Sequence, residues 1–271
     1  PKMKTIKLFI PLIAFSFPLF SQQVSLLSTL ENSIQESSGL IYLEGKIITH
    51  NDSGDDPALY EIDSLTGNLV RTVTVNNASH VDWEDICNDD TYIYIGDFGN
   101  NSGSRTDLKI YRISIADYLE TENDEASAEE INFSYPDQTD FTSGSNETNF
   151  DAEAIISFGD SLYIFSKRWL DNQSAVYSLP KEPGTYTAAK HGMIFINGLI
   201  SGATYNASTG NVMLIGYSFI LPFIVTLSEI NEGDFINANI ERQTIDLPSG
   251  ISVQAEAITA VSSNTYYLSS E

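Results

Sequence analysis

The stretch Asp82-Trp83-Glu84-Asp85-Ile86 is followed closely by Ile93-Tyr94-Ile95-Gly96-Asp97-Phe98-Gly99-Asn100-Asn101, and related pairs of stretches recur along the chain. They are Asp151-Ala152-Glu153-Ala154-Ile155 with Tyr163-Ile164-Phe165-Ser166-Lys167-Arg168, and Gln254-Ala255-Glu256-Ala257-Ile258 with Tyr266-Tyr267-Leu268-Ser269-Ser270-Glu271. Weaker copies begin at Ser38-Gly39-Leu40 and at Gly202-Ala203-Thr204. Self-similarity of this kind indicates a repeat architecture, in which each copy is one unit of structure.

The repeats, counted at Ser38, Glu84, Glu153, Gly202 and Glu256, are 46, 69, 49 and 54 residues apart. Short apolar runs separated by turn residues predict four strands in each unit, and no amphipathic helix of useful length is predicted. The expected strands are 38–43, 46–51, 58–63 and 69–75; 82–88, 91–97, 108–114 and 130–135; 152–158, 161–167, 174–179 and 189–196; 200–206, 211–217, 223–229 and 238–247. This pattern predicts an all-β fold, a β-propeller of four-stranded blades.

The direct count is five blades, with six as the alternative. The fifth unit begins near residue 254 and shows only two strands, so we expect the last blade to be incomplete and the chain to be a C-terminally truncated fragment. The run 24–30 is a candidate for the missing outermost strand. The long second interval is explained by a polar insertion, residues 120–149, which is typical of a surface loop.

Residues 1–21 have the pattern of a secretory signal peptide, because a start with Lys4 and Lys7 precedes an apolar run that ends near Ser21. The alternative, a membrane anchor, is disfavoured because Pro11 and Pro18 interrupt a run too short to span a bilayer. We therefore expect a propeller domain over residues 22–271 that is secreted, extracellular or on the cell surface. We also expect it to be a monomer without an integral membrane segment.

The chain has 37 acidic and 13 basic residues and a formal net charge of −24. A surface this acidic repels phosphate backbones, which excludes nucleic acid as a partner and suits cations or neutral ligands. The single cysteine, Cys87, has no partner for an internal disulfide, and its place on an apolar strand predicts a buried thiol.

In a propeller blade the innermost strand starts beside the end of the antiparallel second strand. The acidic motifs at first-strand starts should therefore meet the second-strand ends on one rim of the central channel. Crowded carboxylates need a cation, a basic partner or a proton, and Lys167 and Arg168 offer the basic partner for Glu153. We predict a Ca²⁺ site with oxygen ligands from Glu84, Asp97, Asn100 and Glu153. The alternative is that these side chains bond the backbone and brace neighbouring blades.

Other residues of the predicted rim are candidates for ligand binding, namely His50, Asp52, Trp169, Glu256 and Glu271. In a metal-dependent hydrolase the metal would activate water, Glu84 or Glu153 would act as base, and Lys167 or Arg168 would stabilise negative charge. Trp83 is interpreted as packing between blades.

The motifs around Glu84 and Glu153, together with Ser166-Lys167-Arg168, resemble secreted bacterial β-propellers of the phytase-like and esterase-like superfamily. A broader similarity is to gluconolactonase-type and strictosidine-synthase-like propellers, which implies a divalent ion in the channel. The leading hypothesis is thus a propeller that binds a small molecule or glycan at a calcium-binding channel mouth. A metal-dependent hydrolase of a phosphoester or lactone and an extracellular adhesion module are the alternatives.

Overall fold

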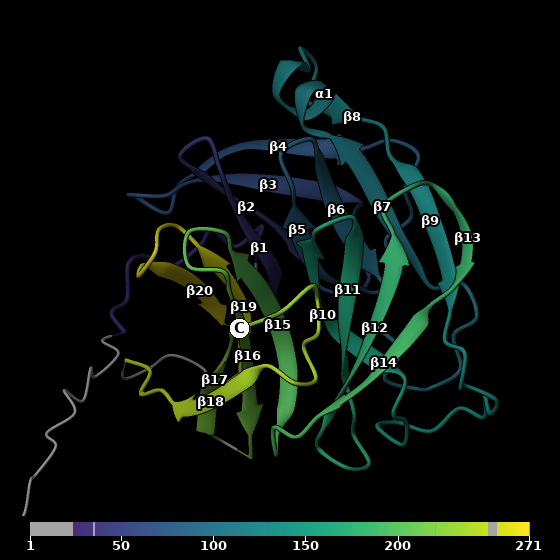
Figure 1. Ribbon diagram of the computed structural model, residues 1–271. Coiled ribbons are helices and arrows are strands. Elements are labelled where there is room, and N and C mark those ends of the chain that lie inside the picture. The colour runs from purple at the N-terminus through teal and green to yellow at the C-terminus, as the bar shows by residue number, and fades with distance from the viewer. Residues whose placement is uncertain (1–23, 35, 220, 249–253, 271) are drawn as a thin grey trace, which may run out of the picture.

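A computed structural model describes residues 24–34, 36–219, 221–248 and 254–270, and it is almost entirely β-structure (Figure 1). The predicted signal segment 1–21 and Glu271 lie outside these ranges. The first two sheets, in spatial order, are β1-β2-β3-β4-β8 and β5-β6-β7-β9-β13. The next are β10-β11-β12-β14 and β15-β16-β17-β18, and β19-β20 form a two-stranded sheet.

The strands of the first two sheets are β1 (Ser37–Leu43), β2 (Lys46–Asn51), β3 (Ala58–Asp63), β4 (Leu69–Val75), β8 (Glu125–Ala126), β5 (Trp83–Asn88), β6 (Tyr92–Asp97), β7 (Lys109–Ser114), β9 (Glu129–Ser134) and β13 (Gly184–Thr187). The others are β10 (Asp151–Phe158), β11 (Ser161–Lys167), β12 (Ser174–Pro180), β14 (Ala189–Ile194), β15 (Leu199–Asn206), β16 (Asn211–Ser218), β17 (Leu221–Ser228), β18 (Asn239–Thr244), β19 (Ala255–Ala260) and β20 (Tyr266–Ser270). The one helix of the described residues is α1 (Ile115–Glu120), capped by the Ser114 side chain.

The sheets are the blades of a propeller, which confirms the predicted architecture. The innermost strands contact one another in the cyclic order β1, β5, β10, β15, β19 and back to β1, and they surround the centre of the ring in Figure 1. Four blades have four or five strands, and the small sheet β19-β20 fills the remaining gap between β15 and β1.

Most predicted strands agree with the observed ones within two residues, but three features differ. Strands β8 and β13 each add in parallel to the outer edge of a preceding blade, on β4 and β9. The insertion 120–149 is therefore not only a loop, since it contains β8 as well as the predicted β9. The run 24–30 forms no strand, so the prediction of an added outer strand there was wrong, although Val24 and Leu30 pack against the core.

Apolar clusters between consecutive blades hold the ring together. Side chains alternate between the two faces of a strand. Accordingly Leu40 packs toward β19-β20, while its neighbour Ile41 packs toward the blade of Trp83. Trp83 is fully buried in this second cluster, as predicted, and the Cys87 thiol is buried in the next one.

Every innermost strand has a β-bulge near its start. The register shifts at Ser38, Glu84, Glu153, Ser201 and Glu256. A bulge leaves one residue unpaired and re-aims its side chain. The fourth repeat is thus equivalent at Ser201 and not at Gly202, which corrects the alignment by one residue. Ser38 and Ser201 donate hydrogen bonds to the Glu84 and Ala255 carbonyls of the next blade, at 2.6 and 2.5 Å, so these two serines brace blades.

The residue after each bulge is small in four of the five strands: Gly39, Ala154, Gly202 and Ala257. A Cβ atom on Gly39 would lie 2.7 Å from the Ile86 nitrogen and 2.7 Å from His50 Nε2. We therefore expect Gly39→Ala to lower the free energy of unfolding by about 1–3 kcal/mol, the usual cost of overpacking. Chemical denaturation measures it, with Gly144→Ala as control because an added Cβ there approaches only the side chain of Glu147. Equal stability of both variants would contradict close packing at the channel.

In the remaining innermost strand, β5, the residue directly after the bulge is Asp85, which is fully buried. Its carboxylate accepts hydrogen bonds from the backbone nitrogens of Ile86 (2.9 Å), Ile155 (2.9 Å) and Ala203 (3.2 Å). These nitrogens belong to β5, β10 and β15. One side chain therefore joins three blades at the centre of the ring, just below the bulged residues.

Candidate functional site at the channel mouth

The bulges bring acidic side chains together at one mouth of the channel. Carboxylate oxygens of Asp52, Asp82 and Glu84 lie within 4.8 Å of one another, and the same holds for Glu84, Asp151 and Glu153. Glu84 belongs to both groups and is 7% exposed. The predicted convergence of Glu84 and Glu153 from equivalent blade positions is therefore observed.

The two groups differ in how their charge is balanced. Among the described residues no hydrogen bond or ion pair reaches the carboxylates of Asp82 or Glu84. Asp52 receives one, from its neighbour Ser53. By contrast, Glu153 forms an ion pair with Lys167. Asp151 accepts hydrogen bonds from the Asn100 nitrogen (2.7 Å) and from Trp169 Nε1 (2.7 Å). The Asp52–Asp82–Glu84 group thus has no ion pair among the described residues, although the charge of Arg105 acts on Asp82 and that of Lys167 acts on Asp52.

Burial and mutual repulsion act together on these groups. Burial, followed by the charge of Asp52, raises the pKa of Asp82 to about 7. Burial and the charge of Glu153 raise the pKa of Glu84 well above its usual range. Burial likewise raises the pKa of Asp52. Carboxylates in this state take up a proton or a metal ion, because the ionised forms repel one another in a site with little water.

Lys167 is the cation of the second group and is only 5% exposed. Its Nζ atom pairs with Glu153 and lies 4.8 Å from the Trp169 ring centre and 5.3 Å from that of Tyr217. Burial opposes its charge, but the negative groups around it, Glu153 first among them, together outweigh burial and raise the pKa of Lys167. The ammonium group is therefore enclosed by protein and held charged.

Three predicted residues have partners outside the acidic groups. Asp97 accepts a hydrogen bond from Arg105 Nη2 at 2.9 Å. The Asn100 side chain accepts a hydrogen bond from the Arg105 backbone nitrogen and donates one to the Phe150 carbonyl. Arg168 forms an ion pair with Asp171. The structure thus does not bring Asp97 and Asn100 into either group with Glu84, nor Arg168 to the carboxylate of Glu153.

The predicted ligand-binding residues are distributed unevenly. Asp52 belongs to the group with Asp82 and Glu84. The Trp169 ring lies over Lys167, and the charge of Glu256 raises the pKa of Glu153. His50 is fully buried, with Nδ1 2.8 Å from the Asn51 carbonyl oxygen, and its ring meets Trp83 edge-on. Burial lowers the pKa of His50 to about 4, so the ring is neutral at physiological pH and inaccessible to a ligand.

Sequence reasoning missed Asp82 and Asp151 as members of the site. A signal was present: each lies two residues before a bulged glutamate, in Asp82-Trp83-Glu84 and in Asp151-Ala152-Glu153. The third motif has Gln254 at this position. The same Asp-x-Glu spacing recurs at the start of two innermost strands, so the repeat itself predicts paired carboxylates at the mouth.

No protein-family profile matches the chain, and no curated protein matches it. Among solved structures, the PQQ-bound aldose sugar dehydrogenase of Streptomyces coelicolor is similar, with 12% identity, 90% of each chain covered and a TM-score of 0.50. The nidogen/laminin complex gives 14% identity over 86% of this chain and 72% of that one, with a TM-score of 0.46. A quinoprotein alcohol dehydrogenase-like protein of Bacteroides thetaiotaomicron gives 13% identity, 89% and 50% coverage, and a TM-score of 0.41.

At these identities the first similarity supports the propeller fold and nothing finer. The resemblance to phytase-like and gluconolactonase-type propellers stays a prediction. No helix among the described residues is long and apolar enough to cross a bilayer.

Proposed function

We propose that this chain is a ligand-binding propeller whose channel mouth holds a divalent cation, Ca²⁺, through Asp52, Asp82 and Glu84. The observation that supports this most directly is that the Asp82 and Glu84 carboxylates are brought together without an ion pair or a hydrogen bond to either of them in the described part of the chain. Hard cations such as Ca²⁺ prefer carboxylate oxygens. A bound ion would neutralise the charges that otherwise force protonation.

The same arrangement suggests what lies beside the ion. Trp169 and Tyr217 flank the enclosed Lys167, and both rings are partly exposed at the rim. Partly exposed aromatic rings next to a polar centre suit a neutral, hydroxylated small molecule or glycan. Its oxygens could complete the coordination of the cation.

In this proposal the small sheet β19-β20 is the inner half of a fifth blade, and the protein acts outside the cell.

A quinone cofactor of the PQQ type does not fit this mouth. PQQ is a polycarboxylate, and in the described part of the chain the mouth presents Asp52, Asp82, Glu84, Asp151, Glu153 and Glu256. The basic groups beside them, Lys167 and Arg105, already pair with Glu153 and Asp97. The alternative of a metal-dependent hydrolase is also less well supported than ligand binding. Lys167 and Arg168, its expected charge-stabilising groups, already pair with Glu153 and Asp171.

Calcium titration by calorimetry tests the proposal. We expect one ion to bind to the wild-type chain after treatment with a chelator, and we expect Glu84→Gln to weaken binding at least tenfold. The matched control is Glu241→Gln on the exposed face of β18, which should bind as the wild type does. Absence of calcium binding to a folded wild-type chain, or equal binding by the Glu84→Gln variant, would refute the calcium site.

A further inference from the structure

The mouth end of the third and fourth blades carries large apolar side chains that are exposed to solvent. We call them the apolar rim: Leu170 (62% exposed), Phe195 (77%), Phe219 (96%) and Leu221 (56%). Leu170 follows the end of β11, Phe195 follows the end of β14, and the other two lie at the turn between β16 and β17. The register places this turn at the mouth, because Leu221 pairs with Ser218 at the end of β16.

The three loops that carry the rim contact one another. The Gly198 nitrogen donates a hydrogen bond of 2.9 Å to the Asn172 carbonyl, which joins the loop before β15 to the loop after β11. Gly198 also lies against the start of β17, because a Cβ atom on it would be 2.4 Å from the Phe223 ring. Tyr217, two residues before Phe219, lies 5.3 Å from Lys167 Nζ. The rim is therefore one continuous border of the channel mouth.

The conformation of Phe219 does not stabilise the chain. Its φ is +57°, in the left-handed region, where a residue with a bulky side chain is strained. A two-residue turn between antiparallel strands favours Asn-Gly, whereas the sequence here is Phe219-Ile220. The ring has no aromatic or cation–π contact within the described ranges. Strained residues of this kind gather at functional sites, so the exposed ring is a candidate contact for a partner.

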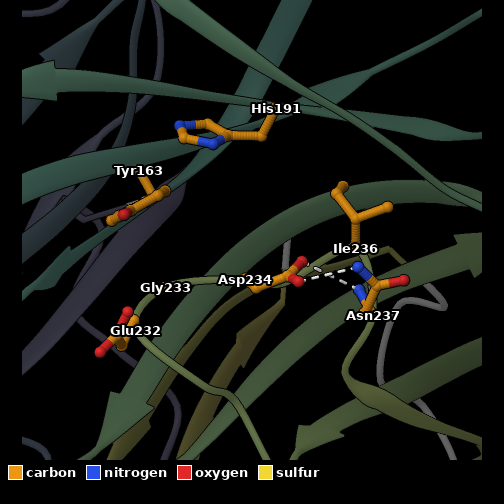
Figure 2. A pocket seen from close by; sticks show the side chains of 7 residues that line it. All are labelled: Tyr163, His191, Glu232, Gly233, Asp234, Ile236 and Asn237. Atoms are coloured by element: carbon orange, nitrogen blue, oxygen red, sulfur yellow. Dashed lines mark hydrogen bonds between the residues drawn. The ribbon is translucent and has the colours of Figure 1, made fainter.

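The opposite end of the same two blades is polar. It holds a pocket of about 260 Å³ whose exposed side chains are His191, Glu232, Asp234 and Asn237. These side chains do not converge on a common point (Figure 2). Among the described residues of both blades, every exposed leucine and phenylalanine belongs to the rim. Exposed apolar patches mark sites of protein or membrane contact, and this one is confined to the mouth.

The charge of the rim favours an uncharged partner surface. Of its three loops only the first has charged residues, and these two, Arg168 and Asp171, pair with each other at 2.5 Å. The neighbouring mouth is acidic, and the formal net charge of the chain is −24, which repels an anionic surface. Protruding apolar side chains on loops without net charge are complementary to a neutral bilayer, whose headgroups carry both signs in equal number.

We propose that the apolar rim inserts into the headgroup region of a zwitterionic phospholipid bilayer and holds the channel mouth against the membrane. Aromatic side chains favour this region, and the strength of binding grows with the apolar area that is buried there. Four side chains give a reversible attachment rather than a permanent anchor. The inference goes beyond the proposed calcium site and does not depend on it.

Flotation of the full chain with phosphatidylcholine vesicles, in the presence of a chelator, tests the proposal. We expect binding that weakens roughly tenfold or more when Phe195→Ser is combined with Phe219→Ser. The matched control, Leu65→Ser, removes a side chain that is 79% exposed at the opposite end of the first blade, and it should bind as the wild type does. Glu84→Gln should also bind normally, which separates the membrane contact from the calcium site. Anionic lipid mixed into the vesicles should weaken binding.

A second variant separates binding from folding. Asparagine adopts the left-handed conformation more readily than phenylalanine, so Phe219→Asn should unfold at the same temperature as the wild type or at a higher one. The same variant should bind vesicles about threefold more weakly or worse. A lower unfolding temperature with unchanged vesicle binding would show that the ring serves the fold and would contradict the proposal.

Other outcomes would also overturn it. One is the absence of flotation by the folded wild type at about 5 mM lipid, near the weak limit of meaningful affinity. Another is equal binding by the wild type and the variant without both phenylalanines. Finally, concentration-dependent dimerisation that this variant abolishes, without vesicle binding by the wild type, would assign the rim to a second copy of the chain.

Discussion

Replacement of Asp85 by alanine is expected to lower the free energy of unfolding by about 3–5 kcal/mol, because three buried backbone donors lose their acceptor and each such loss costs about 1–3 kcal/mol. The variant leaves the backbone nitrogens of Ile86, Ile155 and Ala203 without an acceptor at the centre of the ring. Two of these belong to other blades, so the loss reduces contact between blades and not only within β5. Urea denaturation followed by tryptophan fluorescence measures it, since Trp83 is buried between the first two blades.

Two further variants test this explanation. Asp85→Asn keeps one carbonyl acceptor but points an amide donor toward backbone donors, so we expect roughly half of the destabilisation. Asp160→Ala removes an exposed carboxylate from the turn between β10 and β11 and should change stability by less than about 0.5 kcal/mol. A loss of under 1 kcal/mol in Asp85→Ala would show that water or the remaining chain replaces the carboxylate, and that the side chain does not hold the blades together.

Much of the fold follows from local pattern. The strand at 46–51 was predicted with its observed bounds because the β-branched run Ile47-Ile48-Thr49 follows the turn at Glu44 and Gly45, where φ is positive. The additions β8 and β13 were missed for the opposite reason. Thr185 and Thr187 are polar and exposed, so they give no sign of a buried strand. β13 is a strand only because the edge of β9 supplies hydrogen-bond partners for its backbone. Edge pairing between blades is a tertiary interaction that four residues of sequence do not specify.

The candidate site was likewise predicted only in part. The repeat alone predicts that Glu84 and Glu153 converge, because equivalent positions in a ring of blades face one channel. It does not predict that Asp97 is used elsewhere. That depends on the loop after β6, which folds back so that Arg105 reaches the Asp97 carboxylate. The sequence contains both residues, but the backbone path that joins them depends on contacts such as the bond from Gln138 to the Gly103 carbonyl.

In the absence of divalent cations we expect the protein to be less stable at pH 8.5 than at pH 6.5. The carboxyl of Asp82 has a pKa of about 7 in the folded chain and an ordinary value near 3.8 when unfolded. Its contribution to stability is therefore present below about pH 4 and lost as the pH rises through 7. His50 acts oppositely, because its folded pKa of about 4 means that stability is lost as the pH falls from 6.5 toward 4. Comparing the free energy of unfolding at pH 6.5 and pH 8.5 therefore reports on Asp82 and not on His50, because His50 is neutral throughout this range.

Calcium should reverse this loss. An ion bound only by the folded state stabilises it by about 2.7 kcal/mol at a free concentration 100 times its Kd. The gain should be larger at pH 8.5, because at pH 6.5 the ion must displace protons from Asp82 and Glu84. Thermal unfolding with a chelator and with millimolar calcium at both pH values measures the effect. A gain that is the same at both pH values would contradict direct coordination by these carboxylates.

The Glu84→Gln variant separates a metal site from a merely protonated cluster. Removing this charge relieves repulsion with Asp82 and Glu153, so the metal-free variant should be more stable than the wild type at pH 8.5. The same variant should lose the calcium-dependent gain, whereas Glu241→Gln should alter neither quantity. If Glu84→Gln is destabilised without metal and still gains stability from calcium, Glu84 has a packing role and the ion binds elsewhere. A residue that binds the ion is expected to show both effects. Its charge lowers the stability of the metal-free protein, and the calcium-dependent gain in stability requires it, because repulsion among the carboxylates is relieved only when the ion is bound.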